Sequence, residues 1–408
     1  MTPEKRGVSR AALHLALLGW ATGALFFFYA WILRVAPSVI IDELMRDFAF
    51  GAAAVGNLSA FYFYGYAGMQ IPVGLLMDRF GPRRLMTLAG LACAAGCVLF
   101  ALAPTLWVLS LGRFLIGATS AFGLVGAMMV AGQWFPPARF ALLSGLAMML
   151  GMAGGVFGQA PLRLLVERLD WRAASLALAS GGVLLALAAF STVRDGARGS
   201  SSLRQVMTGL ARVGRNHQTW LIAIAGLGAT GPLLGFASLW GVPYLVLTQG
   251  LDRTAAAGVT STVFIGWGVG APVIGLLSDR IGRRKLPFVL GLTLTAVAMA
   301  GLAWVPGLPL WAVSALCFLC GFGGSSQIVG FAAVRELNPP AAAGAAIGIV
   351  NGAVTGAAPS TSRSWAGCST LPGPERWRVA PASMHLPPTA RPSASWSPAR
   401  SWASPARC

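Results

Sequence analysis

Charged residues are scarce in this chain. They make up only 10% of its 408 residues, compared with about 25% in an average soluble domain. Acidic residues are the rarest, with 12 Asp and Glu against 30 Lys and Arg. Hydrophobic residues make up 56% of the chain, and the mean hydropathy is +0.70. This composition excludes an ordinary soluble globular domain and indicates that lipid is the solvent for most of the chain.

The sequence also lacks the residue patterns of common catalytic and cofactor sites. It contains no constellation of serine, histidine and acid, no phosphate-binding loop and no metal-ligating cluster. Cys317 and Cys320 form a Cys-x-x-Cys pair without a second pair of ligands, so they do not predict a zinc site. Within apolar runs, thiols such as those of Cys93 and Cys97 behave as small apolar groups. We therefore predict that the protein is not an enzyme and uses no cofactor or metal.

Long apolar runs account for most of the sequence up to residue 358. A run of about 20 residues is long enough to cross about 30 Å of hydrocarbon as a helix. Such runs lie at residues 11–33, 52–77, 84–103, 105–131, 139–161, 172–193, 218–247, 255–278, 286–306, 309–334 and 341–358, and the last of them is incomplete. The pattern predicts an all-α polytopic membrane protein.

The basic residues follow position along the chain. A net charge of +18 suggests a nucleic-acid partner in a soluble protein, but here the excess fits the bias of cytoplasmic loops. With a cytoplasmic N-terminus, the inner segments hold Lys5, Arg6, Arg10, Arg79, Arg83, Arg84, Arg139, Arg194, Arg198, Arg204, Arg212, Arg215, Arg280, Arg283, Arg284, Lys285 and Arg335. The outer ends hold Arg34, Arg46, Arg163, Arg168, Arg172 and Arg253. We predict a multi-pass protein of the inner (plasma) membrane that contacts anionic lipid and binds no nucleic acid.

Two copies of one loop motif lie 201 residues apart, each between two apolar runs. Residues 74–84 read Gly-Leu-Leu-Met-Asp-Arg-Phe-Gly-Pro-Arg-Arg, and residues 275–285 read Gly-Leu-Leu-Ser-Asp-Arg-Ile-Gly-Arg-Arg-Lys. Each copy places an acid at the end of one apolar helix and a group of basic residues where the next begins. In this motif the chain resembles the major facilitator superfamily of transporters. The resemblance covers about residues 11–358.

The resemblance implies a fold of two pseudo-symmetric six-helix halves. We expect an N-terminal half at residues 1–193, a cytoplasmic linker at 194–217, an incomplete C-terminal half at 218–358 and a basic tail at 359–408. Residues 362–373 can be encoded by codons whose shifted frame reads Pro-Leu-Val-Gly-Trp-Leu-Leu-Asp-Leu-Ala-Trp, which resembles the end of a span. We therefore hypothesise a frameshift that leaves the eleventh and twelfth spans incomplete or missing. A genuine disordered basic tail is the alternative.

Two arginines lie within predicted spans. Arg34 is near the outer part of the first run, and Arg113 is about a third of the way into the fourth. A charge within a span is costly and is therefore a functional candidate. Two guanidinium groups predict bidentate binding of a carboxylate or phosphate. The alternatives are that Arg34 extends to the outer interface and that Arg113 only joins helices.

This pair of arginines resembles the anion:cation symporter branch of the superfamily, whose members move sugar acids and other organic anions. The resemblance implies that the first and fourth spans line a central cavity. We add Tyr29, Gln159 and Gln327 as polar substrate-binding candidates, although each can instead join helices. Leu33 and Ser120 replace acids that are often found in that branch. The coupling ion, H+ or Na+, therefore stays open.

The acids of the two motif copies are candidate gating residues, because the resemblance implies contacts between the halves there. We expect Asp78 to meet the Pro339–Pro340 turn and Asp279 to meet the Pro136–Pro137 turn. A carboxylate can accept from the N–H groups of a helix start. The basic gating candidates are Arg79, Arg83, Arg139, Arg280 and Arg284. The alternative is that the loop residues only determine topology.

Taken together, the sequence predicts a secondary active transporter that moves a small anionic organic solute by alternating access, as a monomer. One alternative is an inactive, truncated or non-transporting relative. Another is a multidrug efflux transporter. The fifth span ends Gly158-Gln159-Ala160-Pro161 and lacks the Gly-Pro pair of drug:proton antiporters, which weakens the efflux alternative.

Overall fold

The computed structural model describes residues 10–49, 51–70, 72–195, 203–305, 307–338 and 343–356. All of them belong to one compact unit, Met1–Thr370. These residues form helices and short connections, and none of them forms a strand, which confirms the predicted all-α class. The predicted tail at 359–408 and the Pro339–Pro340 turn lie outside the described residues.

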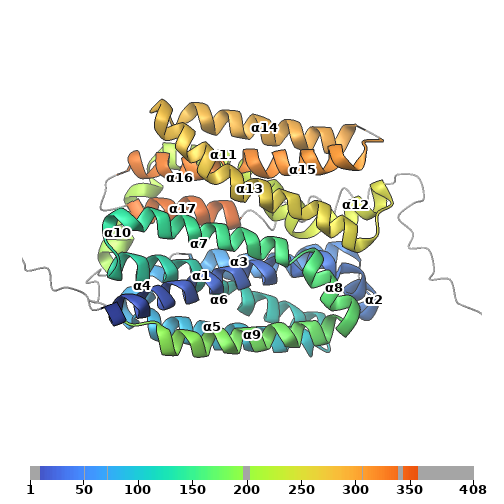
Figure 1. The fold of residues 1–408 in the computed structure, drawn as a ribbon, viewed down its shortest axis with the longest axis horizontal. Coiled ribbons are helices and arrows are strands. Elements are labelled where there is room, and N and C mark those ends of the chain that lie inside the picture. The colour runs from blue at the N-terminus through green and yellow to red at the C-terminus, as the bar shows by residue number, and fades with distance from the viewer. Residues whose placement is uncertain are drawn as a thin grey trace, which may run out of the picture. The chain divides into compact units, whose positions relative to one another are not determined.

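The helices are labelled in Figure 1. The first half of the chain forms α1 (Arg10–Val39), α2 (Ile41–Phe48), α3 (Ala52–Met69), α4 (Pro72–Phe80), α5 (Pro82–Ala101), α6 (Leu106–Trp134), α7 (Pro137–Phe157), α8 (Ala160–Leu169) and α9 (Trp171–Thr192). The second half forms α10 (Leu203–Gly214), α11 (His217–Gly231), the π-helix η1 (Pro232–Trp240), α12 (Gly241–Gln249), α13 (Arg253–Ile281), α14 (Lys285–Trp304), α15 (Leu310–Gly324), α16 (Gln327–Glu336) and α17 (Ala343–Gly356).

Many of these helices can cross a membrane. Within the described ranges, 8 helical stretches are long and apolar enough, and the number is 9 if α7 and α8, which bend by 43°, count as one. The predicted run at 218–247 spans α11, η1 and α12, and the run at 309–334 spans α15 and α16. The run at 52–77 is divided between α3 and α4, and the last run contributes the 14 residues of α17. The chain is therefore a multi-pass membrane protein.

The two halves repeat one helix crossing. In the first half, α3 crosses α6 at Gly65 and Gly117, and in the second, α13 crosses α15 at Gly266 and Gly321. At each glycine, a Cβ would overlap the backbone of the opposite helix. The corresponding glycines are 201 and 204 residues apart, close to the spacing of the loop motif. Only residues without a side chain allow helices to approach this closely.

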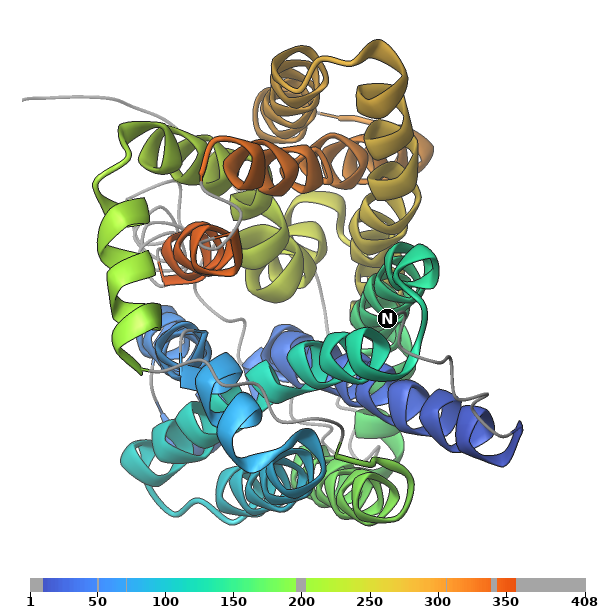
Figure 2. The ribbon, with the colours of Figure 1, turned by 90° about the vertical axis from the view of Figure 1, so that its left-hand side faces the viewer.

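Small residues also join the helices at the edges of each half. Figures 1 and 2 show α5 and α9 side by side, and a Cβ on Gly90 of α5 would lie 3.0 Å from the Cβ of Ala186 on α9. In the second half, α15 packs between α13 and α14. The other face of α9 exposes Leu184, Leu187 and Phe190. Such apolar exposure suits a face that meets lipid.

The helices α2, α8 and α10 were not predicted from the sequence. The eight-residue α2 has two acids in its first turn, and α10 lies inside the predicted polar linker. Both are too short to cross a membrane and too polar to resemble a span. Helix α10 packs against α17, where Val213 is fully buried. Tertiary packing therefore gives the linker a helix that its Gly- and Ser-rich start does not suggest.

Candidate functional site

Arg34 is enclosed by aromatic rings near the end of α1. The residue is 5% exposed. Its Cζ lies 4.1 Å from the ring centroid of Trp31 and 4.5 Å from that of Tyr66. Its Nε donates to the hydroxyl of Tyr62 over 3.2 Å. We call Trp31, Tyr62 and Tyr66 the aromatic cage.

Helical spacing brings the cage residues to one place. Trp31 precedes Arg34 by three residues on α1, and Tyr62 and Tyr66 are four residues apart on α3, so each pair shares a helix face. The rings of Tyr62 and Tyr66 stack, with centroids 6.1 Å apart and planes at 10°. The negative faces of these rings attract the guanidinium. The contact between α1 and α3 that aligns the two tyrosines with Arg34 is tertiary.

Arg113 reaches the same region from α6, but its donors face the backbone of α1. The residue is 2% exposed. Its Nη1 donates to the carbonyl of Leu33 over 2.7 Å and its Nη2 to the carbonyl of Arg34 over 3.4 Å. Its Cζ lies 4.9 Å from the ring centroid of Tyr62. Both arginines therefore contact Tyr62, yet they differ in the groups to which they donate.

No acid accompanies the two arginines. Among the described residues, Arg34 and Arg113 are the charged residues that are buried, and no Asp or Glu is buried. Neither arginine takes part in an ion pair within this part of the chain. The terminal amino groups of Arg34 are engaged by no carboxylate or backbone carbonyl of the described residues. The site therefore presents positive charge without a negative partner.

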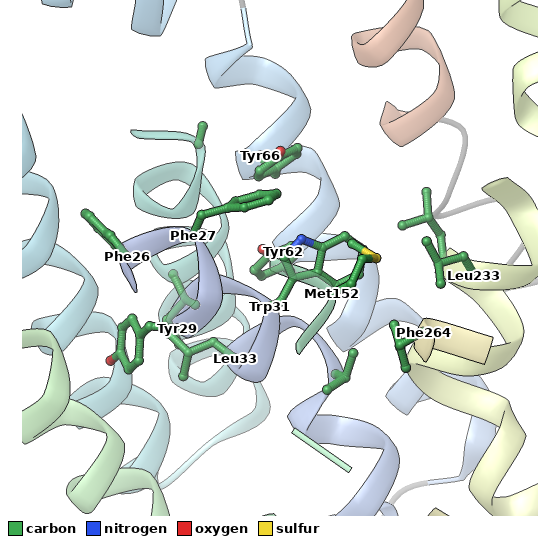
Figure 3. Packing of buried hydrophobic residues seen from close by; sticks show 14 of the residues in the cluster. Phe26, Phe27, Tyr29, Trp31, Leu33, Tyr62, Tyr66, Met152, Leu233 and Phe264 are labelled. Carbon is green, nitrogen blue, oxygen red and sulfur yellow. The ribbon is translucent and has the colours of Figure 1, made fainter. Parts of the chain in front are cut away.

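The cage lies where the two halves meet. The ring of Trp31 makes an edge contact with Phe264 of α13, with centroids 5.9 Å apart. Figure 3 shows Trp31 and Tyr62 with Met152 of α7 beside them and Phe264 on the neighbouring helix. Transporters built from two repeats place substrate at such an interface, where relative movement of the halves changes access.

Tyr29 lies on the other side of α1. Its hydroxyl donates to the carbonyl of Leu178 on α9 over 2.7 Å and lies 3.5 Å from Cys97 Sγ. Figure 3 shows its ring pointing away from Trp31 and Tyr62. The structure therefore does not bring Tyr29 together with Arg34, and its contacts join α1 to α5 and α9.

Gln159 connects three elements at the break between α7 and α8. It is fully buried. Its Nε2 donates to the carbonyl of Ala237 in η1 over 2.8 Å, and its Oε1 accepts from the hydroxyl of Ser38 over 3.3 Å. These bonds link the two halves directly. In this conformation the amide serves as a connection between helices.

Gln327 is the polar candidate of the second half. It is 1% exposed, and neither its Oε1 nor its Nε2 has a hydrogen-bond partner among the described residues. The amide packs against α11 at Gly226, where a Cβ would overlap it. A buried amide without a partner costs about 1–3 kcal/mol. Gln327 therefore offers one donor and one acceptor group that the described protein leaves free.

The basic residues of the two loop copies bind within their own half. Arg284 Nη1 lies 2.5 Å from a carboxylate oxygen of Asp279, and Arg284 Nη2 lies 2.9 Å from Glu336 of α16. These contacts raise the pKa of Arg284, with the hydrogen bond to Glu336 as the largest cause. Arg83 donates from Nε to the carbonyl of Phe190 over 2.8 Å. Asp279 thus pairs with Arg284 in this conformation.

The remaining gating candidates are at the surface. Arg79, Arg139 and Arg280 are exposed, and none of them forms an ion pair with a described residue. The side chain of Asp78 lies outside the described residues, as does the Pro339–Pro340 turn expected to meet it. The expected contacts of Asp78 therefore stay predictions.

A polar network at the opposite end of the bundle was not predicted. At this end, which carries α2 and α8 and is called the α2 end below, Arg253 of α13 pairs with Asp42 of α2. Beside it, the hydroxyl of Thr254 donates to Glu167 of α8 over 3.1 Å. Both contacts join the two halves. The sequence placed these residues in separate loops, and nothing in their spacing indicates that they meet.

The proteins to which this chain is similar are transporters. The sequence model of the Major Facilitator Superfamily matches residues 15–358. The chain is 33% identical over 154 residues to the uncharacterized transporter YybO of Bacillus subtilis, covering 38% of this chain and 35% of YybO. It is 25% identical over 281 residues to the probable sulfoacetate transporter SauU of Cupriavidus necator, covering 64% of each chain. The matches thus span less than two thirds of either relative.

A solved structure shares the fold. It is the crystal structure of a bacterial homologue of the human lysosomal transporter Spinster, in an inward-facing and unoccupied conformation. The TM-score is 0.70 at 18% identity, and the match covers 85% of this chain and 81% of that one. The similarity confirms the predicted polytopic fold of helices.

Proposed function

Because this chain belongs to the Major Facilitator Superfamily, we propose that it is a secondary active transporter that moves a small organic anion by alternating access. The anionic group of the substrate binds Arg34, and the rest of the substrate packs against the aromatic cage. One observation carries the proposal, namely a buried guanidinium with no acidic partner among the described residues. The similarity to a probable sulfoacetate transporter supports an anionic substrate.

The energetics favour an anion at this place. An unpaired buried charge costs several kcal/mol, whereas each cation–π contact contributes about 0.5–2 kcal/mol. The three rings near Arg34 offset this cost by a comparable amount, about 1.5–6 kcal/mol together, but they carry no net negative charge. An anionic ligand supplies the missing charge, and each charge-assisted hydrogen bond that it forms adds about 1.5–3 kcal/mol.

The chemistry of the cage also selects the ligand. The fork of Arg34 matches the two oxygens of a carboxylate or sulfonate. The buried indole N–H of Trp31 has no partner among the described residues and is a further donor beside the guanidinium. The buried positive charge of Arg34, which has no acidic partner among the described residues, discriminates against cations. We infer that the substrate is a small organic molecule that carries at least one carboxylate or sulfonate group.

Ligand binding to the purified protein tests this proposal. We expect sulfoacetate and succinate to raise the melting temperature of the protein in detergent, and the neutral succinamide not to. In Arg34→Gln the shift should disappear, and in Arg34→Lys it should shrink, because an ammonium cannot bind two oxygens side by side. Arg168→Gln is the matched control, since Arg168 is exposed and forms no ion pair among the described residues.

The outcomes separate the alternatives. Equal stabilisation of the parent protein and Arg34→Gln by anions would place the binding site elsewhere. Stabilisation by apolar cations, unaffected by Arg34→Gln, would instead support multidrug efflux. No stabilisation by any anion tested, together with no uptake into proteoliposomes, would support a non-transporting relative.

We also propose how access is controlled. The gating residues are Asp78, Arg79, Arg83, Arg139, Asp279, Arg280 and Arg284. The bonds of Arg284 to Asp279 and Glu336 support a role of the second loop copy, residues 275–285, in stabilising one conformation. In this proposal, the loops face the cytoplasm with the N-terminus, the protein acts as a monomer in the inner membrane, and H+ or Na+ is the coupling ion. Gln327 contributes a polar contact from the second half, and Gln159 joins the halves.

A further inference from the structure

Pro37 removes a backbone donor from α1 close to the aromatic cage. It lies inside the helix, three residues after Arg34. A proline has no N–H, so the carbonyl four residues earlier loses its helical hydrogen bond, and the proline ring pushes that carbonyl outward. The carbonyl concerned belongs to Leu33. A buried carbonyl without a partner costs about 1–3 kcal/mol.

Arg113 supplies the missing donor from another helix. Its Nη1 donates to the carbonyl of Leu33 over 2.7 Å, the shorter of its two bonds to α1. The residue is 2% exposed, and its Nε has no partner among the described residues. Both terminal nitrogens of Arg113 thus serve the backbone of α1. They are not directed at a ligand in this conformation.

The same guanidinium also lies beside the cage. Its Cζ is 4.9 Å from the ring centroid of Tyr62, whose hydroxyl accepts from Arg34 Nε. Arg113 therefore contacts both the backbone that carries Arg34 and the ring that orients its side chain. Movement of Arg113 would change the position of Arg34 through two routes.

We infer that Arg113 is a positioning residue, which replaces the amide missing at Pro37 and thereby holds Arg34 in its anion-binding position. The consequence for affinity rests on the proposed function, whereas the repair of α1 does not. A direct substrate ligand would direct its terminal N–H groups at the ligand, whereas Nη1 and Nη2 of Arg113 each donate to a backbone carbonyl of α1. If the inference is right, anion binding requires Arg113 only as long as Pro37 is present.

A double-mutant cycle tests this dependence. The variants are Arg113→Gln, Pro37→Ala and the double variant. A separate Arg168→Gln protein, changed only at the surface, is the control. In Pro37→Ala an N–H returns to the helix and can satisfy the carbonyl of Leu33. Sulfoacetate affinity should fall about ten-fold or more in Arg113→Gln, change little in Pro37→Ala, and recover in the double variant to within about three-fold of the parent protein.

Melting temperatures of the same four proteins give a readout without ligand. Arg113→Gln should lower the melting temperature, and the added Pro37→Ala substitution should restore most of the loss in the double variant.

If the double variant binds as weakly as Arg113→Gln and is no more stable, the inference is overturned and Arg113 is a direct ligand. If the parent protein binds no anion but the stability cycle shows rescue, the proposed function fails and the repair of α1 stands. If Arg113→Gln does not fold, Arg113→Lys replaces it, and rescue of its affinity and stability by Pro37→Ala decides in the same way.

Discussion

At the residue scale, arginines of this protein bind backbone carbonyls at helix ends. Arg163, Arg172 and Arg83 donate to carbonyls in the last turns of α1, α5 and α9 over 2.9, 3.0 and 2.8 Å, respectively. The last carbonyls of a helix have no intrahelical donor and carry partial negative charge, so a guanidinium suits them. These three arginines therefore have partners that are not acids. Arg34 differs, because its terminal groups bind no such carbonyl within the described structure.

The hydroxyl of Tyr62 should contribute to anion affinity by orienting Arg34. Tyr62→Phe keeps the ring and its cation–π contacts but removes the acceptor for Arg34 Nε. We expect anion binding to weaken by about 1 kcal/mol, or about five-fold. Isothermal titration with sulfoacetate measures the change. Tyr64→Phe is the control, because Tyr64 is 40% exposed on the same helix, and equal affinities in both variants would contradict the prediction.

Asp47 should make stability depend on pH at the α2 end. The indole N–H of Trp171 donates to its carboxylate over 2.9 Å, and this hydrogen bond, with the nearby Arg46 and Arg172, lowers the pKa of Asp47 below its ordinary 3.8. A lowered pKa means that the ionised carboxylate stabilises the fold at neutral pH. This contribution is lost as the pH falls below about 4 and passes through the folded-state pKa.

Thermal melting between pH 7 and pH 3 checks this expectation. The parent protein should lose more stability over this range than Asp47→Asn, in which the group does not titrate. Asp170→Asn is a suitable comparison, because Asp170 caps α9 at the same end and is exposed. Parallel pH profiles of the parent protein and Asp47→Asn would show that the carboxylate contributes nothing.

At the element scale, glycines set how closely helices cross. The crossing of α13 and α15 at Gly321 leaves no space for a Cβ against the backbone carbonyl of Val263. The corresponding crossing of α3 and α6 brings Gly117 against the carbonyl of Tyr62, so it also positions a cage residue. Close packing therefore has a purely structural role in one half and an additional role at the site in the other.

Alanine substitutions separate these roles. Gly321→Ala and Gly117→Ala should each destabilise the protein by about 1–3 kcal/mol, because the helices must move apart. Only Gly117→Ala should also weaken anion binding in the folded fraction. Gly258→Ala on α13 is the control, since its Cβ would meet nothing within 4 Å. Melting curves and sulfoacetate titrations measure both effects, and a Gly321→Ala protein as stable as Gly258→Ala would refute the packing argument.

At the scale of the whole molecule, polar contacts join the halves at the α2 end. The contacts are Arg253 with Asp42, Thr254 with Glu167, and Gln159 with the backbone of η1. The first two pairs involve exposed carboxylates, so each contributes about 0.5 kcal/mol. Opening at this end would break all three contacts. Small contacts of this kind suit an equilibrium between two conformations, because neither state becomes too stable.

Weakening the α2 end should increase its opening. In Arg253→Gln/Thr254→Val we expect about a five-fold higher rate of maleimide labelling at Ser38→Cys, from the loss of about 1 kcal/mol. Ser38 is fully buried beside Gln159. The six natural cysteines are replaced beforehand. Arg168→Gln, at the same end, should leave the labelling rate of Ser38→Cys unchanged. An unchanged rate in Arg253→Gln/Thr254→Val would show that these contacts do not hold the α2 end closed.

The sequence by itself determined the all-α membrane fold, the repeat and the two buried arginines. Run length and the cost of charge in lipid are local properties, so composition and spacing were sufficient for them. Elements that run length does not identify, such as α2 and α10, were missed because packing stabilises them. The contacts of Gln159 and Tyr29 were also not predictable, since their partners lie 78 and 149 residues away.

Only the tertiary structure decided what each arginine binds. Arg34 meets the hydroxyl of Tyr62 across 28 residues, and Arg113 meets the carbonyl of Leu33 across 80. The predicted first span ended at residue 33, so only the structure showed that Pro37 lies inside α1 and leaves the carbonyl of Leu33 without a helical donor. That Arg113 supplies the donor depends on where α6 crosses α1. A guanidinium forms similar bonds with a carbonyl and a carboxylate, so its sequence position alone cannot separate a helix repair from a substrate site.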